Sequence, residues 1–168
     1  PSMPVTVNGG YVMPAWYDIL GANLICQQDA VGIKRSENAI VALIDRELGR
    51  GISHQNIVLA GFSQGCAMAL HTGLRYKQKL AGIVALSGYL PLADTLAHER
   101  SQANANTPIF MAHGTQDPVV VMNRGEVSKN ALIALGYSVQ WKTYVMGHSV
   151  HPDELADISN FLRAVLKA

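Results

Sequence analysis

The sequence has little excess charge of either sign and no apolar run long enough to cross a membrane. Its 168 residues include 13 Lys and Arg against 12 Asp and Glu, which leaves a formal net charge of +1. A near-neutral chain without basic runs argues against nucleic acid or an anionic membrane surface as a partner. No signal-peptide pattern is present either. We therefore expect no nucleic-acid binding, no stable membrane insertion and a cytoplasmic location.

Cysteine is also scarce, with only Cys26 and Cys66 in the chain. Two cysteines do not form a disulfide framework, so we expect buried free thiols of a reducing compartment. Charged residues make up 15% of the chain and hydrophobic residues 49%, which is typical of a globular protein and not of a disordered one. The length suits a single domain with a sizeable core.

The most informative stretch is Gly61-Phe62-Ser63-Gln64-Gly65. A β-rich apolar run at residues 57–60 precedes it, and an Ala/Met/Leu-rich helical pattern follows. In this strand–turn–helix context, G-x-S-x-G indicates a nucleophile elbow, whereas alone it could be a glycine-rich turn. We expect that a Cβ at Gly61 or Gly65 would collide with a neighbouring strand or helix. The helix after Ser63 would turn its free N–H groups toward the reaction site.

Strands and helices alternate along the rest of the chain, with no repeat and no linker. Apolar runs at 80–87, 108–113 and 139–145 are typical of buried parallel strands, and helical patterns cover 30–50, 64–76, 124–135 and 152–166. The pattern predicts one α/β domain, a mostly parallel sheet with helices on both faces.

Four local expectations accompany this architecture. The apolar stripe of 30–50 is expected to pack on the sheet, and the last helix to bury a stripe of Leu155, Ile158, Phe161, Leu162, Val165 and Leu166. Residues 97–107 are polar and are expected to form a surface connection. Residues 5–7 and 11–13 predict a hairpin, for which Asn8-Gly9-Gly10 favours a type I′ turn.

A nucleophilic serine needs a base and an acid that orients the base. Because sites in open α/β sheets lie beyond the carboxyl ends of the strands, the candidates are on strand-exit loops. Asp117 is the only carboxylate on the exit loop of the 108–113 strand, and His148 is the only histidine on the exit loop of the 139–145 strand. The order Ser63, Asp117, His148 is that of α/β-hydrolases. Asp94 is the second choice of acid.

Other histidines are weaker candidates for the base. His113 ends a strand and is expected to hold the following turn by a hydrogen bond. His148 and His151 could form a metal pair, but no third ligand lies at a suitable spacing, so no metal or cofactor is expected. Asp117 would then hold the His148 imidazole, and His148 would take the proton of Ser63 as it attacks an ester or thioester. The Gln64 N–H would donate to the oxyanion.

Four segments together resemble the bacterial carboxylesterase/acyl-protein thioesterase (phospholipase/carboxylesterase) family of α/β-hydrolases, over essentially the whole chain. They are Gly61-Phe62-Ser63-Gln64-Gly65, Leu86-Ser87-Gly88-Tyr89-Leu90-Pro91, residues 113–120 and Met146-Gly147-His148-Ser149. The resemblance implies that Ser63, Asp117 and His148 are a catalytic triad. It also implies short- to medium-chain esters, lysophospholipids or S-acylated proteins as substrates, no cofactor, and a homodimer.

The chain departs from the family at two places. Cys66 stands where the family has glycine, which predicts altered helix packing. The family also begins with further strands and a His-Gly loop that donates the second oxyanion N–H, and no such segment precedes Ser63 in this sequence. Either the sequence is a fragment whose start is missing, or the protein has lost half of its oxyanion hole. We favour an incomplete chain, and expect an α/β-hydrolase domain over residues 1–168 that lacks its N-terminal strands.

Three apolar side chains are candidates for the substrate wall: Trp16, Leu90 and Val119. Two other readings of the sequence remain open. One is a non-catalytic α/β-hydrolase-fold protein that binds an acyl ligand and keeps its triad as a relic. The other, a dienelactone-hydrolase-like enzyme, is disfavoured because that chemistry places cysteine at the position of Ser63.

Overall fold

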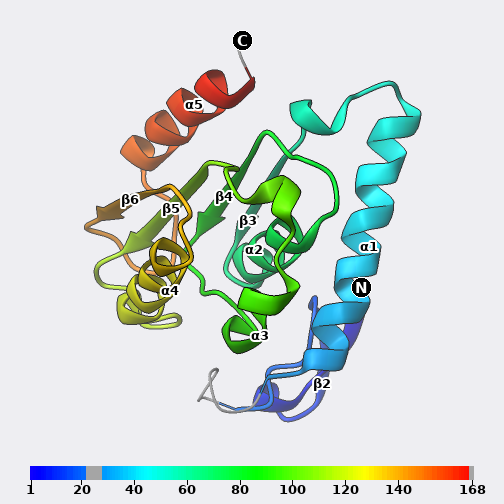
Figure 1. Ribbon diagram of the computed structural model, residues 1–168. Coiled ribbons are helices and arrows are strands. Elements are labelled where there is room, and N and C mark those ends of the chain that lie inside the picture. The colour runs from blue at the N-terminus through cyan, green and yellow to red at the C-terminus, as the bar shows by residue number, and fades with distance from the viewer. Residues whose placement is uncertain (22–27, 167–168) are drawn as a thin grey trace.

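The computed structural model describes residues 1–21 and 28–166 (Figure 1), so the prediction for Cys26 lies outside the described residues. The elements are β1 (Ser2–Val5), β2 (Tyr11–Pro14), α1 (Ala30–Gly49), β3 (Val58–Phe62), α2 (Gln64–Arg75), β4 (Gly82–Leu86), α3 (Ala93–Glu99), β5 (Ile109–Gly114), α4 (Met122–Ala134), β6 (Val139–Tyr144) and α5 (Pro152–Leu166). Short 3₁₀ turns cover Thr6–Asn8, His54–Asn56 and Gln102–Asn104. No described helix is both long and apolar enough to span a bilayer.

Strands β3 to β6 form one parallel sheet in the order β3-β4-β5-β6. Phe62 at the end of β3 pairs with Leu86 at the end of β4. At the other side of the sheet, Gly114 at the end of β5 pairs with Tyr144 at the end of β6. The elbow and the exit loops of β5 and β6 therefore leave the sheet at the same end.

Helices cover both faces of this sheet, as the sequence predicts (Figure 1). On one face, Ile83, Ile109 and Met111 pack against α2, α3 and α4. On the other face, Phe110 packs against Phe161 of α5, with the ring centroids 5.7 Å apart. Alternate residues of a strand point to opposite faces, so two core layers form from continuous apolar runs.

The prediction that α1 packs on the sheet is confirmed only in part. Its stripe of Ile33, Ile40 and Ile44 forms a second core cluster with Ala67 and Met68 of α2, and Leu59 of β3 packs against this cluster from the sheet. Helix α2 occupies this face of the sheet, so α1 lies against α2 (Figure 1). Asp29 caps the start of α1 by accepting a hydrogen bond from the Gly32 N–H at 2.8 Å.

The prediction of a surface connection at 97–107 is confirmed for most of the segment, where residues 97, 98, 100, 102, 103 and 106 are exposed, but part of it is helical and Asn104 and Thr107 are buried. Residues 97–99 belong to α3. The fully buried Asn104 accepts hydrogen bonds from Leu80 N and Thr107 Oγ1, and donates two to the carbonyls of Tyr76 and Gln78. The polar composition of the segment includes a buried amide whose hydrogen bonds are all satisfied.

Two further details differ from expectation. Leu155 is 58% exposed and is not part of the core stripe of α5, whereas Phe161 is buried. The hairpin of β1 and β2 forms as predicted, but the type I′ turn does not. A 3₁₀ turn over Thr6–Asn8 followed by Gly9 and Gly10, both with positive φ, joins the strands. The closing pair is Val5 and Tyr11, which leaves a five-residue loop that a two-residue turn cannot fill.

Candidate active site

Ser63 lies at a sharp turn between β3 and α2 and has φ 56 and ψ −118. Positive φ is unfavourable for a residue with a side chain and costs about 1–3 kcal/mol. The turn stays in place because Ser63 N–H still donates to Leu86 O in the neighbouring strand, at 2.9 Å. The half-buried serine therefore sits at the end of the sheet and immediately before the first turn of α2.

The two elbow glycines have different surroundings. A Cβ on Gly61 would lie 2.0 Å from the Gly65 carbonyl oxygen, so Gly61 is needed as predicted. A Cβ on Gly65 would meet nothing within 4 Å, so the expected collision at Gly65 is wrong. The second crowded position is Gly88, where a Cβ would lie 2.5 Å from Cys66 Cβ. Cys66 is a buried free thiol, and the backbone at Gly88 passes directly against it.

The exit loops of β5 and β6 meet through a hydrogen bond between Asp117 and His148. Nδ1 of His148 donates to Oδ2 of Asp117 at 2.7 Å. Oδ1 of Asp117 accepts two backbone N–H groups, from Val119 at 2.8 Å and from Val120 at 2.9 Å. The Asp117 side chain is fully buried, whereas that of His148 is 16% exposed. The buried carboxylate thus holds the imidazole through Nδ1. The other ring nitrogen, Nε2, makes no hydrogen bond to Asp117.

The charge state of Asp117 follows from these contacts. Burial by itself raises the pKa of this carboxyl, but the hydrogen bonds from His148, Val120 and Val119 outweigh burial and hold the pKa below its usual value. Asp117 is therefore ionised at neutral pH. Because a carboxylate only accepts hydrogen bonds, the proton in the contact belongs to Nδ1 of His148.

The His148 ring also approaches the elbow. Its centroid lies 4.6 Å from that of Phe62, the residue before Ser63. Within the described residues, Ser63 makes no hydrogen bond to His148. Hydrogen bonds between a nucleophile and its base are often long without substrate and tighten only when one is bound. The structure brings Asp117 and His148 into contact and places the imidazole at a tilt of 45° against Phe62, the neighbour of Ser63.

Ser63 opens into a cavity of about 410 Å³. Gln64, Tyr17 and Tyr89 line it, together with an aliphatic wall that includes Val119, one of the predicted substrate residues. The Tyr17 and Tyr89 hydroxyls are hydrogen-bonded to each other at 2.9 Å. A cavity with a mostly apolar wall and a few polar groups suits an acyl chain attached to a polar carbonyl.

Gln64 acts on its surroundings through its side chain as well. Oε1 accepts from the Trp16 N–H at 2.9 Å, and Nε2 donates to the Tyr17 carbonyl at 2.9 Å. The Ser36 hydroxyl donates to the Trp16 carbonyl from α1. We call residues 14–18 the strap, because these bonds fasten them across the elbow. No feature of the sequence predicts this role of the Gln64 amide.

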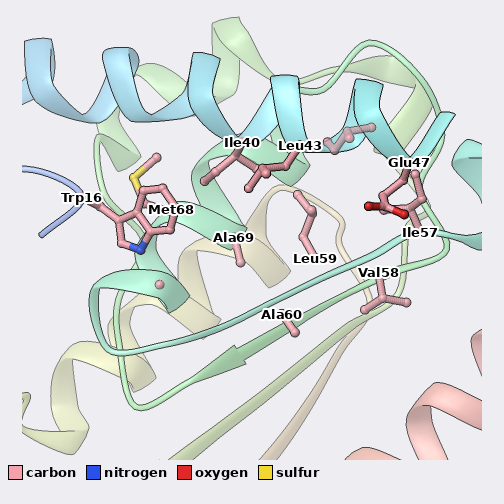
Figure 2. A pocket seen from close by; sticks show the side chains of 12 residues that line it. Trp16, Ile40, Leu43, Glu47, Ile57, Val58, Leu59, Ala60, Met68 and Ala69 are labelled. Atoms are coloured by element: carbon pink, nitrogen blue, oxygen red, sulfur yellow. The ribbon is translucent and has the colours of Figure 1, made fainter. Parts of the chain in front are cut away.

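The other two predicted substrate residues lie in different places. Trp16 lines a shallow cavity of about 330 Å³ that also includes Ser63, and it stands at one end of a separate apolar groove of about 340 Å³ between α1 and β3 (Figure 2). Leu90 is 95% buried in the core, and its backbone N–H donates to Ser128 Oγ at 2.8 Å. Leu90 is therefore a core residue and does not line the described wall of the Ser63 cavity.

The remaining candidates for base and acid have other surroundings. His113 is buried, and its Nε2 lies 2.7 Å from the Val120 carbonyl oxygen, which confirms its predicted hold on the turn. His71 is buried against Glu37. Asp94 is exposed in the first turn of α3. Residues 1–21 and 28–166 contain no group of three or more His, Cys, Asp or Glu placed to hold a metal ion.

Several side chains that line the Ser63 cavity were not predicted as site residues, among them Tyr17, Tyr89 and Arg124. Arg124, in the first turn of α4, lines the cavity with Ser63 and Tyr89. A signal was available, because the positive end of the helix dipole disfavours a cation in the first turn of a helix. Arg124 lies seven residues after Asp117, and the helix dipole does not favour a positive charge at this position of α4.

The chain matches known proteins over nearly its full length. The sequence model of the phospholipase/carboxylesterase family matches residues 1–166. Acyl-protein thioesterase 1 of Gibberella zeae is 46% identical over 174 residues, which cover 99% of this chain and 74% of that protein. Acyl-protein thioesterase 1 of Saccharomyces cerevisiae is 38% identical and covers 100% of this chain and 76% of its own length.

Solved structures give the same picture of the fold. SOBER1 of Arabidopsis thaliana superimposes with a TM-score of 0.92 at 30% identity, over 99% of this chain and 80% of its own. Acyl-protein thioesterase 2 of Zea mays superimposes with a TM-score of 0.85 at 32% identity, over 99% of this chain and 78% of its own.

Proposed function

The chain belongs to the phospholipase/carboxylesterase family, and from this premise we propose that it cleaves carboxylic esters or thioesters through an acyl-enzyme on Ser63. Identities of 38–46% with acyl-protein thioesterases over nearly the whole chain make it an esterase or thioesterase of the hydrolase class. The roles of individual residues and the choice of substrate are the proposed part.

The hydrogen bond between Asp117 and His148 is the observation that carries the proposal. Ionised Asp117 fixes the proton of His148 on Nδ1, which leaves Nε2 as a proton acceptor. Nε2 takes the hydroxyl proton of Ser63 as the serine oxygen attacks the carbonyl carbon. The same nitrogen then gives this proton to the leaving alcohol or thiol. Water, deprotonated in turn by His148, releases the acid and restores Ser63.

The negative charge that develops on the carbonyl oxygen needs donors that are already in place. We propose the backbone N–H of Gln64 as one of them. Gln64 is the first residue of α2, so its N–H has no partner within the helix and lies at the positive end of the helix dipole. The strap bonds of the Gln64 side chain hold this residue in position.

Substrate class, location and assembly are also proposals. The relatives are named acyl-protein thioesterases, and the mostly apolar Ser63 cavity fits a hydrocarbon chain, so we favour an S-acylated protein over a simple ester. A cytoplasmic location agrees with the unpaired thiol of Cys66. The family resemblance favours a homodimer, which light scattering of the purified protein tests.

The experiment labels the protein with a fluorophosphonate probe and measures hydrolysis of a matched oxyester and thioester of the same acyl chain. We expect labelling at Ser63 and turnover of both substrates, with the higher kcat/KM for the thioester. Ser63→Ala should remove both labelling and turnover. A protein that is labelled equally well after this substitution would sink the assignment of Ser63.

Ser87→Ala is the matched control. Ser87 also has positive φ at the end of the neighbouring strand β4, but it is fully buried and does not line the described cavity of Ser63. Its replacement should leave labelling intact. Folded wild-type protein without turnover of either ester would instead favour a protein that only binds acyl ligands.

A further inference from the structure

Glu154 is a buried carboxyl group whose hydrogen bonds are only partly satisfied. It lies in the first turn of α5 and has no exposed surface. Its Oε1 makes no hydrogen bond with any described residue, and burial raises the pKa of this carboxyl group. Buried polar atoms are nearly always hydrogen-bonded, so one that is not needs an explanation. The contacts of the other oxygen, Oε2, suggest one.

Oε2 of Glu154 accepts the backbone N–H of His151 at 3.2 Å. His151 immediately precedes Pro152, the first residue of α5, so this is the bond of a capping box, from the first turn back to the residue before the helix. The His151 imidazole takes part as well, because its Nδ1 accepts from the Asp153 N–H at 3.2 Å. Glu154 therefore fixes the backbone at the point where the loop from β6 becomes helix.

That loop, residues 145–151, carries His148 and connects β6 to α5 (Figure 1). Its two ends are joined to each other. The rings of Tyr144, the last residue of β6, and of His151 are stacked, with their centroids 5.8 Å apart and 15° between the planes. The Tyr144 hydroxyl donates to Asp157 Oδ2 at 2.7 Å, further along α5. The start of α5 thus holds both ends of the loop.

The loop of His148 is also bound to the loop that carries Asp117. Gln116 N–H donates to Met146 O at 3.0 Å. The loop is thereby held between two supports, the Asp117 loop and α5, and it places His148 Nδ1 2.7 Å from Asp117 Oδ2. Because only two residues separate His151 from His148, a shift of the backbone at His151 can move the imidazole.

We propose that Glu154 is a positioning residue for the base: through the N–H of His151 it holds the loop so that His148 meets Asp117 and Ser63 in the orientation that catalysis needs. This inference rests on the proposed hydrolysis at Ser63. The bond of Oε2 depends on an acceptor and not on a charge, so an amide in its place should serve as well. An apolar side chain should leave the fold intact, since the loss of the capping bond is offset by removal of the unpaired Oε1, but should misplace the base.

The experiment replaces Glu154 with methionine, which is similarly long and unbranched but lacks a strong acceptor, and measures hydrolysis of a p-nitrophenyl ester. Glu154→Met should lower kcat about 10- to 100-fold, the effect of displacing a reacting group by about 1 Å. KM should change less than about twofold, and the thermal midpoint should stay close to that of the wild type. Glu154→Gln, whose amide oxygen can still accept from His151, should keep most of the wild-type kcat.

Two further measurements separate positioning from a general structural role. Proton NMR follows the Nδ1 proton of His148, which reports on the hydrogen bond to Asp117. Its resonance should shift or broaden in Glu154→Met and stay in place in Glu154→Gln. Asp153→Asn is the matched control, because it removes a carboxylate from the same helical turn at a side chain that is 82% exposed. It should change neither kcat nor the His148 resonance.

Wild-type kcat in Glu154→Met would overturn the proposal, and so would a loss of kcat that Glu154→Gln shares or that leaves the His148 resonance unchanged. If Glu154→Met does not fold, Glu154→Leu is measured in the same way, and loss of folding in both variants would overturn the proposal in favour of a purely structural role. Wild-type turnover is the separate readout of the proposed function. Its absence counts against hydrolysis at Ser63, whereas the NMR comparison still decides on Glu154.

Discussion

Two of the histidine–carboxylate pairs among the described residues, Asp117–His148 and Glu37–His71, have opposite patterns of burial. In the pair of Asp117 and His148, the carboxylate is fully buried and the imidazole is 16% exposed, with 2.7 Å between Oδ2 and Nδ1. In the pair of Glu37 and His71, the imidazole is fully buried and the carboxylate is 24% exposed, with 3.2 Å between Oε2 and Nε2. The first pair joins two strand-exit loops, and the second joins α1 to α2.

The difference shows that a histidine–carboxylate contact is not by itself an active-site signature. What matters is where the second ring nitrogen points. In His148, Nδ1 contacts the carboxylate, which leaves Nε2 free of it on a side chain that is partly exposed. In His71 the carboxylate takes Nε2, and Nδ1 is buried without a hydrogen-bond partner among the described residues. A base must reach the proton that it removes, so only the first pair can serve in catalysis.

Replacing Asp117 tests this comparison most strongly. Asp117→Asn keeps an acceptor for Val119 and Val120 but no longer fixes the tautomer of His148. We expect kcat for a p-nitrophenyl ester to fall about 10⁴-fold, with a thermal midpoint close to that of the wild type. Asp94→Asn, at the exposed second-choice acid, should leave kcat unchanged. A large loss in Asp94→Asn with a small one in Asp117→Asn would reverse the assignment.

Replacing Glu37 should have the opposite signature. Glu37→Ala leaves the buried Nε2 of His71 without its partner, which lowers the free energy of unfolding by about 1–3 kcal/mol. kcat should stay within about twofold of the wild type. Urea unfolding measures the first quantity, and ester hydrolysis the second. Glu37→Gln, which can still accept a hydrogen bond, is the matched control and should lose less stability. If Glu37→Ala lowers kcat as strongly as Asp117→Asn, the two pairs are not functionally distinct.

The smallest expected effect is on the pH dependence of stability. The folded-state pKa of Asp117 lies below the ordinary carboxyl value of about 4. Its contribution to stability is therefore complete above about pH 4 and is lost as the pH falls through the lower folded-state pKa. The free energy of unfolding of Asp117→Asn should decline less steeply than that of the wild type over this acid range. Parallel curves would contradict the ionised state assigned to Asp117.

The sequence was most informative where chemistry and topology coincide. The elbow at Ser63 needs a strand, a tight turn and a helix in immediate succession, and the residue pattern encodes all three. Asp117 and His148 could be paired because parallel strands place their exit loops at one end of the sheet. Continuous apolar strands likewise predicted helices on both faces. Local rules sufficed in these cases because each depends on neighbours in sequence or on a general property of parallel sheets.

The failures involve contacts between segments distant in sequence. Nothing near Asn104 shows that its amide joins residues 76, 78 and 80, so its polarity suggested a surface loop. The stripe of α1 has the right period, but a period does not identify the partner, which is mainly α2, with Leu59 of the sheet packed against the same cluster. Arg124 was missed because only the folded chain brings the start of α4 to the wall of the Ser63 cavity.

The strap also has a consequence for motion. Its Trp16 amide donates to the side chain of Gln64, and its Trp16 carbonyl accepts from Ser36. The Trp16 N–H can exchange with deuterium only when the strap leaves the elbow. The exchange rate of this one amide therefore measures how often this part of the site opens, and the measurement needs no substrate. If an acyl ligand slows exchange at the Trp16 N–H, the ratio of the two rates measures how strongly the bound ligand stabilises the closed strap.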